Sequence, residues 1–119
     1  MKIAIPAENK SMTSSVYESY ARAPYFLIYN TITKEYEFLD NSAVLSQGAA
    51  GIRVSQIIAD NGVKALITPR CGENANNILK NAEVLVYQSA PGSLQDNINE
   101  FIQDKLKLLD EFHPGLHKK

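Results

Sequence analysis

The chain has 119 residues, of which 45% are hydrophobic, and a formal net charge of -1 at pH 7. This length predicts one domain, and the near-neutral charge excludes a general basic field that would hold nucleic acid or a membrane surface. Its single cysteine, Cys71, cannot form an internal disulfide, which fits a reducing compartment. The apolar run at the N-terminus is too short for a signal peptide, and no apolar run approaches the roughly 20 residues of a membrane span. We therefore expect a cytoplasmic protein with no nucleic-acid or membrane partner.

The first half of the chain predicts three strands and one long loop. Residues 2–6 form a short apolar run that is typical of a buried strand. Residues 24–31 and 35–40 are rich in aromatic and branched side chains, and a short turn between them predicts an antiparallel hairpin. The polar stretch 7–22 is longer than a usual connection, so we expect a mobile binding loop that closes over the functional site.

The second half alternates helices with short apolar strands. The expected elements are, in chain order, a helix over residues 48–60, a strand over 63–68, a helix over 74–81, a strand over 83–88 and a helix over 94–109. Ser93 and Asp96 have the spacing of a capping box at the start of the last helix, and its apolar stripe continues to Leu109. Residues 113–119 are expected to be a mobile tail.

This order, β-β-β-α-β-α-β-α, predicts a three-layer α/β domain over residues 1–112 with a mixed five-stranded sheet. The strand over residues 63–68 is apolar throughout, so we expect it inside the sheet and buried on both faces. Ligands of such sheets bind outside the carboxyl ends of the parallel strands. The loops that leave those ends are 7–22, 68–74 and 88–93, and Cys71 lies in the second.

Two interpretations of Cys71 come out about even. It follows an apolar run and Pro69-Arg70, and it precedes a predicted helix. An arginine neighbour and the positive end of a helix both favour the thiolate, which attacks electrophiles and binds soft metals. The alternative is a small buried hydrophobic residue. The first interpretation predicts a partly accessible thiol with a pKa below about 8.5.

Other candidate sites are weaker. Gly48, Gly51 and Arg53 open the first long helix and could admit an anion, although close helix packing is the favoured explanation. His113 and His117 have the spacing of two metal ligands on a helix, but Pro114 and Gly115 between them favour a disordered tail. The central strands contain no set of carboxylates, so a two-metal nuclease is not expected.

Four short motifs occur in an order that resembles a known family. They are Met1-Lys2-Ile3-Ala4-Ile5-Pro6, Ala21-Arg22-Ala23-Pro24-Tyr25-Phe26, Gly48-Ala49-Ala50-Gly51-Ile52-Arg53 and Cys71-Gly72-Glu73-Asn74-Ala75. The chain resembles, from Met1 to about Leu109, the dinitrogenase iron–molybdenum cofactor biosynthesis family, that is, the NifX-like domain also found at the end of NifB proteins. The resemblance implies a ribonuclease-H-like α/β fold and a carrier role for iron–sulfur-type clusters.

The chain departs from this family pattern at two places. Ser19-Tyr20-Ala21-Arg22 stands where the family commonly has His-Phe-Gly-Arg, so a histidine that could bind a cluster is replaced. Cys71-Gly72-Glu73-Asn74 stands where many members have a Gly-Pro-Asn turn without cysteine. One potential ligand is lost and another is present.

These observations predict a small non-enzymatic protein that transiently carries an iron–sulfur or iron–molybdenum-type cluster. Cys71 is the candidate metal ligand. The full set of candidate cofactor-binding residues is Arg22, Arg70, Cys71, Gly72 and Asn74. The partners implied are metal-cluster assembly proteins, and the chain would be a monomer or a homodimer. The alternatives are an interaction or regulatory module that binds no cluster and, more weakly, a thiol-dependent enzyme that uses Cys71.

Overall fold

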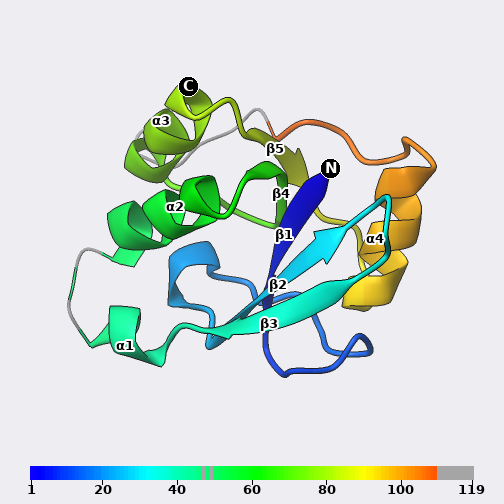
Figure 1. Cartoon of the computed structure of the whole chain (residues 1–119), viewed down its shortest axis with the longest axis horizontal. Helices are drawn as coiled ribbons and strands as arrows, with labels where there is room; N and C mark the ends of the chain where they lie inside the picture. The colour runs from blue at the N-terminus through cyan, green and yellow to red at the C-terminus, as the bar shows by residue number, and fades with distance from the viewer. Residues whose placement is uncertain (47, 49, 110–119) are drawn as a thin grey trace.

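The computed structural model describes residues 1–46, 48 and 50–109 (Figure 1). The elements are β1 (Lys2–Ala7), the 3₁₀ helix η1 (Tyr20–Arg22), β2 (Tyr25–Asn30), β3 (Tyr36–Asp40), α1 (Ser42–Leu45), α2 (Ala50–Asp60), β4 (Val63–Thr68), α3 (Glu73–Asn81), β5 (Leu85–Gln88) and α4 (Leu94–Ile102). The predicted strands are confirmed, with shifts of one or two residues at their ends. No helix among the described residues has the length and apolar character that crossing a bilayer requires.

The strands form one mixed five-stranded sheet in the order β3-β2-β1-β4-β5. β1 pairs antiparallel with β2 and parallel with β4, β2 and β3 form the expected antiparallel hairpin, and β4 and β5 are parallel. β4 lies between β1 and β5, and all its side chains except Lys64 are buried. The mixed α/β fold is therefore confirmed, whereas its ribonuclease-H-like classification stays a prediction.

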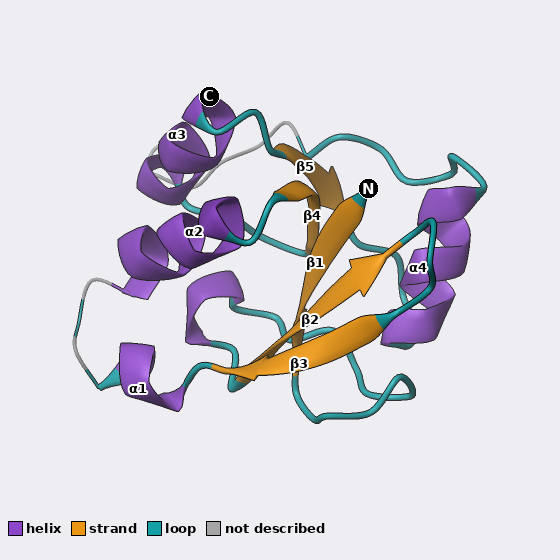
Figure 2. Ribbon diagram, in the orientation of Figure 1, coloured by secondary structure: helices purple, strands orange, loops and turns teal. Residues whose placement is uncertain are grey.

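Helices cover both faces of this sheet (Figure 2). On one face α2 and α3 lie side by side, and their side chains Val54, Ile58 and Leu79 join the core that includes Phe26 and Leu66. On the opposite face α4 packs its Leu94 and Ile98 against Ile3, Ile5 and Ile67. The sheet is thus the middle of three layers, as the strand–helix alternation predicts.

The last helix is shorter than its apolar stripe predicts, so the expectation of a helix to residue 109 is wrong. α4 ends at Ile102 because Asp104 adopts a positive φ of 60°, and the amide of Lys105 donates to the carbonyl of Glu100. This pattern closes a helix end and turns the chain. The segment then runs antiparallel to β5, where Gln88 N donates to Lys107 O and Leu109 N donates to Val86 O.

The long loop 7–22 is bound to the body of the protein at several points. The amides of Leu94 and Gln95 donate to the carbonyls of Ser14 and Met12, at distances of 2.9 and 3.0 Å. The loop ends in η1, which was not expected from the sequence. Its mobility stays a prediction, whereas its approach to the loop after β4 is described below. The tail 113–119 and His113 and His117 lie outside the described residues.

Candidate functional site

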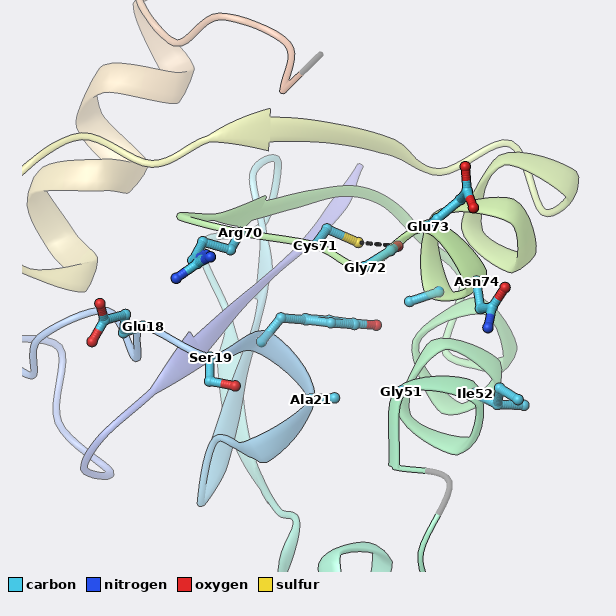
Figure 3. A pocket seen from close by; sticks show the side chains of 12 residues that line it. Glu18, Ser19, Ala21, Gly51, Ile52, Arg70, Cys71, Gly72, Glu73 and Asn74 are labelled. Atoms are coloured by element: carbon cyan, nitrogen blue, oxygen red, sulfur yellow. Dashed lines mark hydrogen bonds between the residues drawn. The ribbon is translucent and has the colours of Figure 1, made fainter. Parts of the chain in front are cut away.

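A cleft of about 890 Å³ lies beyond the carboxyl end of β4, between η1, α2 and α3 (Figure 3). Its lining consists of residues 18–21, 51–52 and 70–75. It therefore combines the end of the loop 7–22, the first turn of α2, the loop after β4 and the first turn of α3. This is the edge of the sheet at which ligands of α/β proteins bind, and the loop 7–22 reaches it as expected.

The first turn of α3 presents free backbone donors to the cleft. Gly72 is the N-cap and has no side chain to accept a hydrogen bond, and the first helical bond is from Asn76 N to Gly72 O at 2.9 Å. The preceding amides of Glu73, Asn74 and Ala75 have no acceptor among the described residues. Since the first amides of a helix carry its partial positive charge, they favour an anion here.

The first turn of α2 adds a second helix start to the cleft, beside that of α3 (Figure 3). Gly51 and Ile52 line it, and the Cβ of any residue replacing Gly51 would lie 3.9 Å from the Cβ atoms of Ala21 and Ala75. The small residues thus bring η1, α2 and α3 close together. The sequence favours helix packing as the role of Gly51. In the structure Gly51 both packs against η1 and α3 and lines the cleft.

The ionised side chains around the cleft are of both signs. Arg70 is exposed and supplies a cation, whereas Glu18 and Glu73 supply carboxylates. In the view of Figure 3, Arg70 and Glu18 lie at one end of the cleft and Glu73 at the other. The helix starts and Arg70 therefore favour negative charge in the cleft, and the two carboxylates disfavour it.

Cys71 is buried, so the prediction of an accessible thiol with a lowered pKa is wrong. Only 2% of its surface is exposed, and its Sγ donates to the carbonyl of Gly72 at 3.6 Å. Burial raises the pKa of the thiol to about 12, because a thiolate is poorly solvated in an apolar core. The chain alternates here: Arg70 and Gly72 face solvent while Cys71 points into the core shared with Leu79.

A buried hydroxyl pair joins two walls of the cleft. The Oη of Tyr20 lies 2.9 Å from the Oγ of Ser55, and Ser55 Oγ donates to the carbonyl of Gly51 at 2.6 Å. The Tyr20 ring packs edge-on against Phe26, with centroids 5.6 Å apart. Burial raises the pKa of the Tyr20 hydroxyl. Sequence reasoning missed this pair, since nothing local links a tyrosine to a serine 35 positions later.

Four of the five candidate binding residues meet in the cleft: Arg70, Cys71, Gly72 and Asn74. Arg22 belongs to η1 but is not part of the lining. Within residues 1–46, 48 and 50–109, no group of three or more His, Cys, Asp or Glu side chains could hold a metal ion. Any metal centre bound at the cleft would therefore need ligands from another source.

A sequence model described as dinitrogenase iron-molybdenum cofactor matches residues 1–104. The chain belongs to this family. Membership confirms the resemblance found in the sequence, and it links the chain, at the level of the family, to the iron–molybdenum cofactor.

Relatives of the chain share nearly its whole length. A putative NifB protein from Thermotoga is 35% identical, with a TM-score of 0.83 and coverage of 97% of this chain and 98% of that one. The apo form of the orange protein from Desulfovibrio gigas is 25% identical, with a TM-score of 0.85 and 92% of each chain covered. An uncharacterised protein of Methanocaldococcus jannaschii is 28% identical over 110 residues, 90% of each chain.

Proposed function

We propose that this protein binds and carries an anionic iron–sulfur or iron–molybdenum-type cluster in the cleft between η1, α2 and α3, without catalysing a reaction. The observation that carries the proposal is the convergence of two helix starts on one open cleft, where the amides of residues 73–75 find no acceptor within the described part of the chain. Backbone amides at helix starts are general binding sites for anions.

The cleft suits a cluster that arrives already assembled. A protein-owned [4Fe–4S] cluster is normally held by four cysteines, and this chain has one. A completed cluster brings its own sulfide bridges, so the protein has only to offset charge and exclude some water. About 890 Å³ lies within the range of roughly 300–1,000 Å³ of small-molecule sites. Arg70 would balance part of the negative charge of the cargo.

The relatives support the same role. The family is named for the iron–molybdenum cofactor, and the Thermotoga relative is described as a putative NifB protein. The orange protein was solved in an apo form, which implies a form with a bound group. A carrier of this kind would exchange its cargo with metal-cluster assembly proteins in the cytoplasm.

Cys71 and Arg22 have conditional roles in this proposal. The Cys71 thiol lines the cleft but is buried and protonated, so it could contact an iron only after the part of the chain above it moves. Arg22 lies on η1 beside the lining residue Ala21 and could add positive charge at the rim. Neither residue is required for the first contact with the amides.

A role as an interaction or regulatory module without a cluster is the second candidate. The burial of Cys71 favours it, because a carrier with its one soft ligand hidden is a weaker carrier. The same burial argues against a thiol-dependent enzyme, since a catalytic cysteine works as an exposed or partly exposed thiolate.

Anaerobic reconstitution with ferrous iron and sulfide, with and without molybdate, tests the proposal. After desalting, metal analysis and visible absorption should show retained iron and sulfide in the parent protein. Arg70→Gln should retain several-fold less, whereas Lys105→Gln should match the parent because Lys105 is exposed, follows α4 and lies outside the lining. Retention by none of the proteins, or equal retention by Arg70→Gln, would contradict cluster binding at this cleft.

A further inference from the structure

The short helix η1 and the loop after β4 each contribute a buried side chain, Tyr20 and Cys71, to the lining of the cleft. Cys71 belongs to the lining, yet it is only 2% exposed, and Tyr20 of η1 is only 4% exposed. Both side chains belong to the same core cluster. Tyr20 is the largest of the buried residues in the lining, and it lies near enough to Cys71 for the charge of a thiolate there to act on its hydroxyl.

Few contacts hold η1 in place. Before it, Tyr17 N donates to Pro6 O at 2.9 Å, and after it, the buried Asn41 side chain donates to Ala23 O at 2.9 Å. Between these two anchor points, Glu18, Ser19 and Arg22 are exposed. The Tyr20 side chain is buried in the core, and the small Ala21 side chain is partly buried against it. The side-chain hydrogen bonds from this stretch to the rest of the protein are those of Tyr20 with Ser55, at 2.9 Å, and of Asn41 with Ala21 O, at 3.2 Å.

We infer that Tyr20 and Ser55 are positioning residues whose hydrogen bond holds η1 closed over Cys71, and that release of this bond opens the cleft to the thiol. That a cluster reaches Cys71 through this opening rests on the function proposed above. The opening of η1 itself does not depend on that function. Ser55 keeps its own bond to Gly51 O in either state. Opening therefore breaks the hydrogen bonds of Tyr20 with Ser55 and of Asn41 with Ala21 O, and it moves one short segment between two anchored residues.

The inference predicts an order of thiol accessibility among variants. Tyr20→Phe removes one buried hydrogen bond and keeps the ring against Phe26, so native-state alkylation of Cys71 should be about five- to tenfold faster. Ser55→Ala should act more strongly, because it leaves the Tyr20 hydroxyl buried without its partner. The double variant should react more slowly than Ser55→Ala, since replacing both partners removes the unpaired group.

The experiment is alkylation of the apo protein by iodoacetamide at one fixed pH, at several urea concentrations below the unfolding transition. Opening of η1 exposes little surface, so the rate should depend weakly on urea, whereas labelling through global unfolding follows the full urea dependence. Tyr29→Phe is the matched control, because Tyr29 is a buried tyrosine in the core on the α4 side. It should label at the parent rate.

Two results would overturn the inference: the full urea dependence of global unfolding in every variant, or equal rates for Tyr20→Phe and Tyr29→Phe. Should Ser55→Ala not fold, the comparison of those two tyrosine variants decides alone. Because the apo protein is used, a failure here is separate from a failure of cluster binding. Fast alkylation of Cys71 in Tyr20→Phe, together with no cluster retained by the parent protein, would support the inference and contradict the carrier function.

Discussion

A single buried amide, that of Asn97, fixes the loop between β5 and α4. Its Oδ1 accepts from Ala90 N at 2.7 Å, and its Nδ2 donates to the carbonyls of Ala90 and Ser93, both at 3.0 Å. The residue is fully buried. Removing this side chain would leave the amide and the carbonyl of Ala90 without these partners, whereas Ser93 O also accepts from Asn97 N at 3.0 Å.

We therefore expect Asn97→Ala to lower the free energy of unfolding by about 2–3 kcal/mol, because the partly buried N–H and C=O of Ala90 would lose their partner. Asn99→Ala, on the same helix but exposed, should cost well under 1 kcal/mol. Urea denaturation of both variants measures the difference. Equal losses would show that the buried amide has no special role.

The hidden thiol gives the protein an alkaline limit of stability. In the folded state the pKa of Cys71 is raised from its ordinary 9.0 to about 12 by burial, so the folded protein keeps the proton that the unfolded chain releases. Stability is full below pH 9 and falls as the pH rises from about 9 to about 12, by up to about 1.4 kcal/mol per pH unit. The Tyr20 hydroxyl, whose pKa burial also raises, adds to the fall at the upper end.

Urea unfolding at pH 8, 9, 10 and 11 checks this expectation. Cys71→Ala should be less stable than the parent at pH 8 but should lose less stability between pH 9 and pH 11. If the stability of the two proteins fell equally with pH, the Cys71 thiol would have the same pKa in the folded and unfolded states, and the prediction would be wrong.

Glu18 lies on the loop before η1 and lines the cleft, so its negative charge opposes the binding of an anionic cargo. Glu18→Gln should raise cluster retention about two- to fivefold at low salt, in line with the modest worth of exposed charges. The gain should shrink as ionic strength rises. Glu100→Gln, on α4 and outside the lining, is the control. A lower retention in Glu18→Gln would mean that the carboxylate contributes to binding.

At the level of elements, the sequence predicted most of the fold and failed where structure depends on distant contacts. Short apolar runs and helical spacing located the strands and the main helices because each must bury one face. The end of α4 was missed because Leu106 and Leu109 continue the stripe while actually packing on opposite sides of the sheet. Similarly, η1 depends on the insertion of Tyr20 and has no periodic signal of its own.

The candidate site was also predictable only in part, because the orientation of its side chains depends on contacts between residues that are distant in the sequence. Topology placed the loop after β4 at the ligand-binding edge, which correctly brought Arg70, Gly72 and Asn74 to the cleft. The orientation of Cys71 depends on which way the chain leaves β4: Thr68 Oγ1 donates to Arg70 O at 3.0 Å and fixes the turn. Sequence neighbours alone could not reveal that the thiol faces inward.

For the molecule as a whole, the segment after α4 completes the sheet edge. Residues 107–109 hydrogen-bond along β5, Leu109 is 8% exposed, and the family match ends at residue 104, before this segment. A chain that stops after Asp104 loses the packing of Leu106 and Leu109 and leaves the β5 edge unpaired. Exposed strand edges promote association between chains.

We expect the free energy of unfolding of that shortened chain to be about 2–4 kcal/mol lower than that of the full chain, because the packing of two leucines is lost. We also expect it to self-associate. A chain that stops after Leu109 keeps this segment and should be more stable than the chain that stops after Asp104. Urea unfolding and size-exclusion chromatography measure both. If the two shortened chains behave alike, the segment after α4 contributes nothing to the sheet edge.

The most direct test of cluster binding at the cleft is an amide NMR spectrum recorded during anaerobic reconstitution with iron and sulfide. Nuclei near a paramagnetic cluster relax faster and their signals broaden. We expect broadening of the amides of Gly51, Ile52, Glu73, Asn74 and Ala75, with those of α4 unchanged. Broadening centred on α4 or on residues 110–119, or no broadening with iron retained, would contradict the cleft as the binding site.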